Sequence, residues 1–452
     1  MKILVVGGGG REHAIIMKLM QSEKTEKVYC TPGNGGIAAA GAECFDVSAT
    51  DIEGVVKLAK ELKVDMVAVA PDDPLVLGMV DALQAEGFMT FGPKKCAAII
   101  EGSKVFSKNL MKKYNIPTAF YEVFTEADKA IAYLKEQNSY PAVIKADGLA
   151  LGKGVIIAQN EEEAIQAVRE MIEDKKFGES STRIVIEEFL TGPEVSVLSF
   201  TDGKTMVPMI SSMDHKRAYD NDEGLNTGGM GTVSPNPYYT EEIAKECMEK
   251  IFIPTMEAMN AEGRTFEGCL YFGLMLTPKG PKVIEYNCRF GDPETQVVLP
   301  MLDSDLVEIF EAIYNHELDK LDIKWKSGSC ACVVMASGGY PEKYDKGIEI
   351  SGLDAKGQIE CCEVYHAGTK LSDSKFLTNG GRVLGVTATG LTLNGALEKA
   401  YDGVKKIDWD KVHYRKDIGQ RALKALDNDE LHLGYKDDME DYIEENGVYL
   451  RQ

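Results

Sequence analysis

The sequence contains no hydrophobic run long enough to cross a membrane. A membrane-spanning helix needs roughly 18 or more consecutive apolar residues, and no run in this chain approaches that length. The start, MKILVVGGGG, has one lysine and too short an apolar stretch for a secretory signal peptide. We therefore expect no membrane partner, no export and a cytoplasmic location.

Metal-type cysteine spacing is also missing. The ten cysteines never form the paired CxxC spacing of a zinc site, nor the regular cysteine spacing of a small, disulfide-bonded secreted protein. They are therefore expected to be reduced thiols with mostly structural roles.

Basic residues are fewer than acidic ones. The chain has 50 Lys and Arg against 72 Asp and Glu, which gives a net charge of -22. Affinity for nucleic acid comes from clustered Lys and Arg that neutralise phosphates, so nucleic acid is not an expected partner. If phosphates bind this chain, local basic groups must hold them, and a divalent cation would help.

The length and the local patterns indicate several domains. A chain of 452 residues suggests about three. In 1–101, short apolar strands alternate with amphipathic helices, one of them expected from about Leu75, and this predicts an open parallel α/β sheet. Residues 102–328 form a second region, with a smaller unit over about 121–190, and 329–426 are expected to be an α+β domain. The acidic range 427–452 predicts a tail or a short docking helix.

Three loops in the first region follow strands and are expected to converge at one sheet edge. They span 7–10, 32–36 and 71–74. The first is rich in glycine, but Glu12 stands where a dinucleotide fingerprint needs Gly or Ala, and the second strand ends without an acid. Anion binding by exposed amides at the helix start is favoured. A tight strand-to-helix connection is the alternative.

The stretch AVIKADGLALGKGVIIA places a glycine-rich loop between two strands. Lys145 ends the first strand, and Gly152, Lys153 and Gly154 precede the second. The P-loop pattern fails, because the glycine spacing is too short and a strand follows where a helix is required. Such a hairpin can close over phosphates as a flexible lid. A mobile surface hairpin is the other interpretation.

Two polar stretches follow. In RIVIEEFLTGPEVSV, Glu187 and Glu188 end a strand, where paired acids are usually solvated; their place between lid and core favours a function. Residues 211–237 then form a long polar stretch with DHKR and NTGGMG, which predicts a functional loop with a second backbone nest for an anion.

The segment EYNCRFGDPETQ carries the strongest chemical signal. It ends the second strand of a hairpin predicted from two apolar runs joined by TPKGP, after a helix predicted over about 241–261. Side-chain alternation puts Val283, Glu285 and Asn287 on one face of that strand. Glu285 and Asn287 are then roughly 7 Å apart and offer oxygen ligands that suit magnesium. Arg289 follows with a planar fork for a carboxylate or phosphate, and Asp292 lies in a turn. A surface salt-bridge cluster is the alternative.

Taken together, these motifs resemble the phosphoribosylamine–glycine ligase family of the ATP-grasp superfamily. GGGGREHA, PGNGG, FGP, SKVFSK, IKADGLALGKGV, DHKR, NTGGMG, IEYNCRFGDPETQ, ASGGYPEKY and GGRVLGVTA occur in the family's order and cover nearly the whole chain. RFGDPETQ resembles the family signature and is the most specific of them. The resemblance implies an N-terminal α/β domain, a central ATP-grasp domain with a flexible lid, and a C-terminal α+β domain.

The resemblance also implies a reaction. Glycine is joined to 5-phospho-β-D-ribosylamine in purine biosynthesis, with ATP converted to ADP and phosphate through a glycyl phosphate. Phosphoryl transfer of this kind depends on positioning and charge neutralisation, so lysines and a divalent metal suffice without a protein nucleophile. This agrees with the lack of a convincing Ser, Cys or His triad.

The family's functional residues transfer to matching positions. By this resemblance, Lys104 and Lys145 contact the ATP phosphates, and Gly152, Lys153 and Gly154 cover them. Glu187, Glu188 and Leu190 line the adenine hinge, and Glu194 binds the ribose hydroxyls. The implied catalytic residues are Arg289, Asp292, Asp214 and Lys216. The implied substrate contacts are Gly9, Gly10, Asn34, Gly35, Asp72, Arg217, Arg289 and Asp292. Glu285 and Asn287 resemble the ligands of Mg²⁺ or Mn²⁺.

The sequence departs from the family pattern at three places. Asp72 replaces the usual Glu of the third loop, Leu225 stands where proline is common, and the acidic range 427–452 is additional. Another ATP-grasp carboxylate–amine ligase with different substrates is the nearest alternative. A nucleotide-binding regulatory protein and a dehydrogenase are less favoured. Small molecules are the expected partners of a monomer or weak homo-oligomer.

Overall fold

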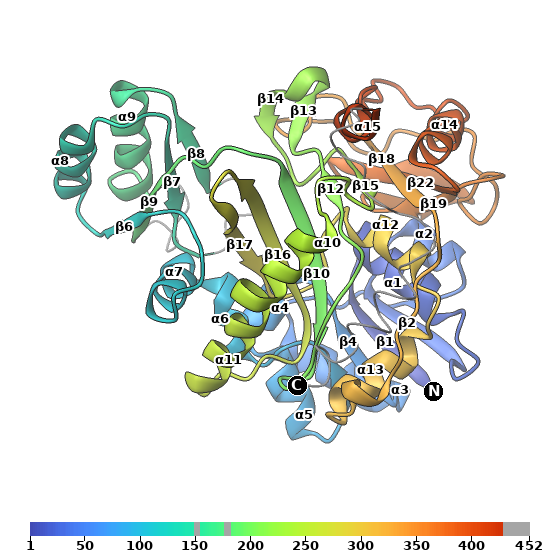
Figure 1. Ribbon diagram of the computed structural model, residues 1–452. Helices are drawn as coiled ribbons and strands as arrows, with labels where there is room; N and C mark the ends of the chain where they lie inside the picture. The colour runs from blue at the N-terminus through green and yellow to red at the C-terminus, as the bar shows by residue number, and fades with distance from the viewer. Residues whose placement is uncertain (149–153, 176–181, 428–452) are drawn as a thin grey trace.

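The computed structural model describes residues 1–148, 154–175 and 182–427. Figure 1 shows a body of three packed regions from which a smaller α/β unit, at the left of the view, projects. In the described ranges, no helix is both long and apolar enough to span a bilayer.

The N-terminal region is an open parallel sheet of order β3-β2-β1-β4-β5, as the strand and helix alternation predicted. Its strands are β1 (Lys2–Gly7), β2 (Lys27–Pro32), β3 (Glu43–Cys44), β4 (Met66–Val69) and β5 (Met89–Phe91). Its helices are α1 (Gly10–Leu19), α2 (Gly35–Ala39), α3 (Ile52–Leu62), α4 (Asp72–Leu77), α5 (Met79–Ala85) and α6 (Lys95–Gly102). The central strands are continuously apolar because helices cover both sheet faces.

The projecting unit, here termed the lid subdomain, falls in the range of about 121–190 that was expected to form a smaller unit. It has an antiparallel sheet of order β6-β9-β7-β8 with two helices packed on it. Its elements are β6 (Tyr121–Phe124), α8 (Ala127–Gln137), β7 (Ala142–Ala146), β8 (Val155–Ala158), α9 (Glu161–Ile172) and β9 (Ile184–Glu188). Helix α7 (Lys104–Lys113) leads into the unit, and its N-cap Ser103 accepts a hydrogen bond from Phe106 N at 3.1 Å.

The central sheet, of order β11-β10-β16-β17, contains the predicted hairpin. Its strands are β10 (Glu194–Thr201), β11 (Met206–Pro208), β16 (Gly268–Thr277) and β17 (Gly280–Asn287). The predicted helix over about 241–261 runs as α10 (Glu241–Cys247), a π-helical turn (Met248–Phe252) and α11 (Ile253–Ala261). After the hairpin come α12 (Thr295–Val298), a 3₁₀ turn (Leu299–Met301), α13 (Leu306–Tyr314) and a second 3₁₀ turn (Leu318–Lys320).

The C-terminal sheet takes strands from two parts of the chain. Its order is β12-β15-β18-β22-β19, with β12 (Met213–Asp214), β15 (Gly231–Ser234), β18 (Ser329–Ala336), β19 (Glu363–His366) and β22 (Arg382–Gly390). Two hairpins lie beside it: β13 (Arg217–Tyr219) with β14 (Glu223–Asn226), joined by a 3₁₀ turn (Asp220–Asp222), and β20 (Thr369–Ser372) with β21 (Lys375–Thr378). Helices α14 (Leu393–Val404) and α15 (Gln420–Asp427) complete the region.

Two local predictions need correction. The range 211–237 was expected to be a loop, but it contains four short strands, two of which pair with the C-terminal sheet. This pairing is non-local, so the polar local sequence did not reveal it. The helix expected from about Leu75 begins at Asp72, where the carboxylate lies at the helix N-terminus.

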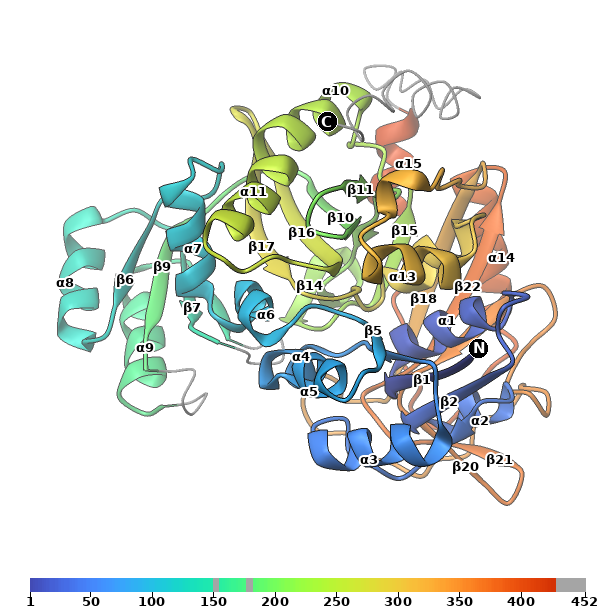
Figure 2. The same ribbon diagram turned by 90° about the horizontal axis from the view of Figure 1, so that it is seen from below.

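Helix α1 joins the N-terminal and C-terminal regions. Seen from below (Figure 2), it lies between the N-terminal sheet and the C-terminal strands. His13 Nδ1 on this helix accepts a hydrogen bond from His366 N at 2.8 Å. The loops after β1 and β2 are therefore held against the C-terminal region, which brings distant parts of the sequence to one site.

Candidate active site

Glu285 and Asn287 lie on one face of β17, as predicted, but Val283 does not share that face. The pairing of β16 with β17 shifts register so that Ile284 is an extra residue, and Glu285 pairs with Gly273. Such a β-bulge reverses the side-chain alternation on one side of it. Val283 is fully buried in the core on the opposite face. The prediction for Val283 was wrong because strict alternation does not hold across a bulge.

The bulge also shapes the surroundings of Glu285. A Cβ atom at Gly273 would lie 3.0 Å from Glu285 Cγ, so the glycine leaves room for that side chain. The carbonyl of Ile284 accepts a hydrogen bond from Lys145 Nζ at 3.2 Å. The irregular strand therefore positions a carboxylate and a lysine in the same place.

Cationic side chains surround Glu285. Burial raises the pKa of this carboxyl, but Lys216, Lys145, Lys104 and Arg289 outweigh burial, and the resulting pKa is below its ordinary value. Lys216 Nζ lies 3.8 Å from Glu285 Oε1, and 37% of the glutamate side chain is exposed. An ionised, accessible carboxylate among four cations can hold a metal ion beside a bound polyanion.

Both predicted phosphate lysines lie at the junction of the lid subdomain and the body. Lys104, the first residue of α7, donates to Gly148 O at 2.7 Å. Lys145 on β7 lies 3.0 Å from Glu187 Oε1. Gly154 directly precedes β8, and its carbonyl accepts from Ala146 N at 2.8 Å. The predicted contacts Gly152 and Lys153 lie outside the described residues.

The predicted adenine and ribose residues follow along β9 and the start of β10. Glu188 Oε1 accepts from Phe120 N at 3.0 Å and pairs with Lys282 at 2.9 Å. Leu190 is half-buried in the connection between these strands. Glu194 pairs with Lys216 at 3.1 Å, which links the predicted ribose residue to the cations around Glu285.

Arg289 is held by an acid that the sequence analysis missed. Arg289 Nη2 lies 3.0 Å from Glu101 Oε1 and 3.9 Å from Asp72 Oδ2. Glu101 also accepts from Cys288 N at 2.7 Å and, with the Asn287 amide oriented to satisfy both neighbours, from that side-chain nitrogen at 3.0 Å. The Asn287 nitrogen thus faces Glu101, and its oxygen is the atom left to act as a ligand.

Asp292 is fixed by a second missed residue, Arg382. Asp292 Oδ1 accepts from Gln296 Nε2 at 2.8 Å, and Oδ2 lies 3.5 Å from Arg382 Nη2. Arg382 Nη1 also donates to the carbonyls of Asp292 and Gly228, both at 2.8 Å. Burial raises the pKa of Asp292, but Arg382 and the neighbouring donors outweigh it and lower that pKa. Arg382 begins β22, so the C-terminal region contributes directly to the site.

The DHKR stretch divides between the site and a surface hairpin. Burial and the neighbouring Glu294 raise the pKa of the Asp214 carboxyl well above its ordinary value. Lys216 faces Glu194 and Glu285. Arg217 Nη1 instead donates to Gly224 O at 2.8 Å, within the hairpin of β13 and β14.

His215 is a structural residue whose burial predicts acid sensitivity. Its Nδ1 lies 3.0 Å from Gly231 O and its Nε2 accepts from Gly419 N at 3.1 Å, a pattern that fits the neutral ring. Burial lowers the pKa of His215 to about 4, from 6.5. The pKa of His215 is lower in the folded protein than in the unfolded chain. The contribution of the neutral ring to the free energy of unfolding is therefore complete above about pH 6.5 and is lost as pH falls towards 4. Protonation of His215 is expected to lower the free energy of unfolding by about 3 kcal/mol.

The measurement is urea unfolding of the wild type and His215→Asn at pH 7, 5.5 and 4.5. Asparagine offers a donor and an acceptor but cannot take up the proton, so its unfolding free energy should fall less steeply with acid. The unfolding free energy of His215→Asn should still fall somewhat with pH, because burial also lowers the pKa of His366 to about 4. Identical slopes in the two proteins would contradict the assignment.

The first two N-terminal loops converge, but several of their polar groups are already bonded. Gly9 N donates to Glu12 Oε2 at 2.7 Å, so a side chain of the following helix already satisfies this amide. Asn34 Nδ2 donates to Gly8 O at 2.9 Å and to His366 O at 2.7 Å. A Cβ atom at Gly10 would lie 2.6 Å from Gln296 Nε2, and one at Gly35 would lie 2.7 Å from Leu371 N. These positions pack closely against other regions of the chain.

The residues around Glu285 fit a metal that completes its coordination with other oxygens. In the described ranges, no group of three or more His, Cys, Asp or Glu side chains is arranged to hold a metal ion. Glu285 and Asn287 could supply two oxygen ligands, and magnesium in phosphate-binding sites commonly has few protein ligands and takes the rest from phosphates and water.

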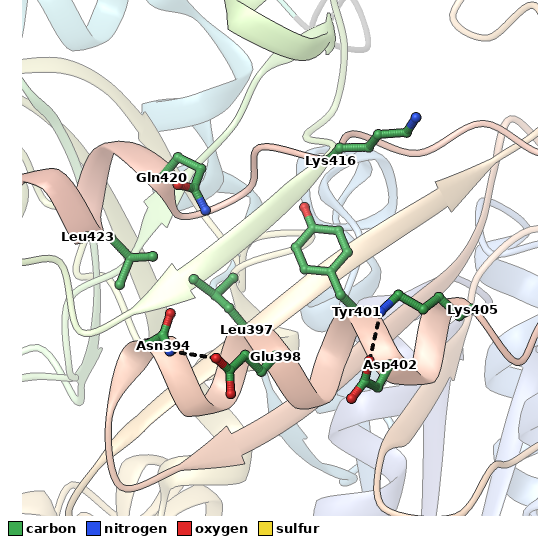
Figure 3. Close-up of a pocket in the computed structure, with 9 residues that line it drawn as sticks. All are labelled: Asn394, Leu397, Glu398, Tyr401, Asp402, Lys405, Lys416, Gln420 and Leu423. Carbon is green, nitrogen blue, oxygen red and sulfur yellow. Dashed lines mark hydrogen bonds and ion pairs between the residues drawn. The ribbon is translucent and has the colours of Figure 1, made fainter.

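A surface groove in the C-terminal region is lined by other residues. It has a volume of about 300 Å³ and lies between α14 and α15, with Leu397 and Tyr401 on its floor (Figure 3). Its polar side chains pair along α14, as Asn394 does with Glu398 at 2.8 Å. None of the predicted site residues lines it, so we assign the chemistry to the charged cluster around Glu285.

Comparisons with known proteins agree on one family. Three family models match in chain order, described as phosphoribosylglycinamide synthetase N domain (1–101), ATP-grasp (A) domain (102–295) and C domain (330–421). A phosphoribosylamine–glycine ligase of Caldanaerobacter subterraneus is 47% identical over 418 residues, covering 92% of this chain and 99% of that protein. One of Halalkalibacterium halodurans is 49% identical over 424 residues, covering 94% and 97%.

Solved structures show the same fold. The crystal structure of a phosphoribosylamine–glycine ligase from Thermotoga maritima has a TM-score of 0.79 and 34% identity, and covers 92% of this chain and 100% of that one. A biotin carboxylase from Campylobacter jejuni has a TM-score of 0.71 at 15% identity, with 97% of each chain covered, which supports the fold alone.

Proposed function

The chain belongs to the phosphoribosylamine–glycine ligase family, and on this premise we propose that it joins glycine to 5-phospho-β-D-ribosylamine. ATP is converted to ADP and phosphate, and glycinamide ribonucleotide is the product. The glycine carboxylate first takes the γ-phosphoryl group from ATP. The amine nitrogen then attacks the glycyl carbonyl, and phosphate leaves.

The observation that carries the proposal is the group of cations around Glu285. Lys104 of α7, Lys145 of β7 and Lys216 of the DHKR stretch all lower the pKa of this carboxylate, and Lys216 lies 3.8 Å from it. Transfer of a phosphoryl group requires the reactants to be aligned and their negative charge neutralised, with little covalent work for the protein. Three lysines beside an accessible carboxylate are suited to that task.

Glu285 and Asn287 would hold Mg²⁺ or Mn²⁺. When bound, the ion supplies positive charge for the phosphate oxygens of the nucleotide. Glu285 remains ionised because the surrounding cations lower its pKa, and Asn287 directs its nitrogen to Glu101. Gly154, with Gly152 and Lys153, would cover the phosphates, while Glu187, Glu188, Leu190 and Glu194 would bind the nucleoside.

The other charged residues would act on the reacting groups. The Arg289 fork and Lys216 would orient the glycine carboxylate and its phosphorylated form. Asp214 has a raised pKa and would accept the proton that the attacking amine loses. Asp292 would hold the ribosylamine, and Asp72 would contact the same substrate. The contact expected of Arg217 stays a prediction, because its side chain bonds within the β13–β14 hairpin.

The N-terminal loops would bind the ribose phosphate. Since the Gly9 amide and the Asn34 side chain already bond within the protein, Gly10 and Gly35 would contribute through main-chain amides. We further propose that the protein acts in the cytoplasm as a monomer or weak homo-oligomer. The ranges 1–101, 102–328, 329–426 and 427–452 stay predictions of the domain limits.

The test is an assay of ADP release with glycine and phosphoribosylamine supplied separately and together. ADP release should reach its full rate only when both substrates are present, and mass spectrometry should identify glycinamide ribonucleotide as the product. ADP release that requires a different amine or acid would refute the substrate pair and favour another ATP-grasp carboxylate–amine ligase.

A further inference from the structure

A further lysine lies next to the residues of the proposed nucleotide site. Lys108 is one helical turn after Lys104 on α7, and only 3% of its side chain is exposed. Its Nζ lies 3.0 Å from Glu187 Oε2 and donates to Thr118 Oγ1 at 2.8 Å. A fully buried lysine is rare unless it is paired, so the contact with Glu187 is what stabilises its charge.

Glu187 is shared between two lysines. Its Oε1 lies 3.0 Å from Lys145 Nζ, and its Oε2 lies 3.0 Å from Lys108 Nζ. The glutamate side chain is 4% exposed, so water screens these interactions little. One carboxylate between two ammonium groups leaves a net charge of +1. With Lys145 alone, the pair would be neutral.

The same residues connect the lid subdomain to the hairpin of Glu285. Thr118 Oγ1, which accepts from Lys108, donates to Val283 O at 2.8 Å. Lys145 donates to Ile284 O, the next carbonyl along β17, at 3.2 Å. The contacts therefore close a ring that runs through α7, the lid strands and the bulge next to Glu285.

We propose that Lys108 is a positioning residue for nucleotide binding. It takes up part of the charge of Glu187, so that Lys145 keeps a net positive charge for the phosphates, and it ties the lid strands to the hairpin of Glu285. This inference rests on the proposed ATP-dependent function. Lys108 itself does not touch the reacting atoms.

The surroundings of Lys108 give the inference a pH signature. Glu187 of β9 contacts it, Glu188 and Lys145 act on its charge from β9 and β7, and the Tyr121 ring centroid on β6 is 5.7 Å from its Nζ. Burial lowers the pKa of Lys108 to about 8, although Glu187 opposes that shift. The charge is therefore present below about pH 8 and is lost as pH rises through it. Above that pH, Glu187 would neutralise Lys145.

The test measures the affinity for a non-hydrolysable ATP analogue, adenylyl imidodiphosphate with Mg²⁺, by calorimetry between pH 7 and 9. Lys108→Met should raise the dissociation constant about tenfold at pH 7, a change of about 1.4 kcal/mol. Lys108→Arg should bind like the wild type at pH 7 and keep its affinity at pH 9, because guanidinium stays charged. The wild type should lose affinity over the same interval.

The matched control is Lys112→Met, because Lys112 is on the same helix, also lies 5.7 Å from the Tyr121 ring centroid, and is exposed. It should leave the affinity unchanged. Wild-type affinity at pH 7 in Lys108→Met, or equal pH profiles for the wild type and Lys108→Arg, would overturn the inference alone. The arginine comparison decides the matter even if the methionine variant fails to fold. A wild type that binds no analogue would overturn the proposed function as well.

Discussion

Glu285→Ala should abolish product formation while the protein stays folded. The variant removes a proposed metal ligand, the carboxylate whose pKa is lowered by Lys216, Lys145 and Lys104. Charge stabilisation by a bound metal contributes several kcal/mol to a phosphoryl-transfer transition state, so kcat/KM should fall by at least about 10³-fold. Steady-state ADP release at saturating glycine and modest magnesium measures the effect.

The fold should tolerate this change. The lowered pKa of Glu285 means that its ionised form contributes stability above its unfolded pKa, and that this contribution is lost as pH falls through the folded pKa. Because 37% of the side chain is exposed, the contribution should be no more than about 1 kcal/mol. Lys216 also keeps its partner Glu194 at 3.1 Å.

Glu349→Ala is the matched control. Glu349 is another half-exposed glutamate that pairs with a lysine, Lys375, at 2.8 Å, and it lies on the surface of the C-terminal region. Its removal should change neither activity nor folding. Near-normal turnover by Glu285→Ala would refute the ligand assignment.

Arg289 should be the second position with a large effect, and two variants separate its roles. Arg289→Lys keeps the charge opposite Glu101 but loses the fork that also reaches Phe290 O at 3.2 Å. A point charge cannot replace two-toothed binding of a carboxylate or phosphate. We expect kcat/KM to fall roughly 10²–10³-fold, as when one preorganised transition-state donor is removed. Urea unfolding should change little.

Arg289→Met should destabilise the protein instead. It leaves Glu101 buried, at 7% side-chain exposure, without its cation, and breaking a buried pair in this way costs about 3–5 kcal/mol. Burial already raises the pKa of Glu101 despite Arg289, so the carboxyl should protonate more readily in the variant. The destabilisation of Arg289→Met should therefore be large at neutral pH. It should shrink in acid, where the Glu101 carboxyl is protonated in both the folded and the unfolded protein.

A compensating change tests this explanation. Adding Glu101→Gln to Arg289→Met removes the uncompensated charge. The urea concentration at half-unfolding should then rise part of the way back to the wild-type value, while activity stays low. If the double variant is no more stable than Arg289→Met, the stability role of the Arg289–Glu101 pair is wrong.

Local patterns predicted much of the fold. Strands and helices that alternate over 1–101 could form a parallel sheet only if helices covered both faces, and that sheet is present. The hairpin that ends at Asn287 was predicted from two apolar runs joined by TPKGP. Both signals are local, because each depends on neighbours within a few residues. The strand at 231–234 was missed because its partner β18 begins only at Ser329, and the strand at 213–214 pairs in turn with the strand at 231–234.

The site was predicted in part for the same reason. Glu285, Lys145 and Asp214 stood out because they interrupt strands or lie in glycine-rich stretches. Glu101 did not, since its partner Arg289 is 188 residues away. Lys108 had one available signal: its spacing from Lys104 puts both lysines on one face of α7. The roles proposed for all of these residues stay predictions.

The sequence by itself determined the family, the order of the elements and the residue types available for phosphate chemistry, because periodicity and short motifs are written along the chain. Only the tertiary structure decided which charges pair, that a bulge turns Val283 away from Glu285, and that Arg382 reaches Asp292. Buried charges are stable only beside partners from other elements, and such partners cannot be identified until the chain is folded.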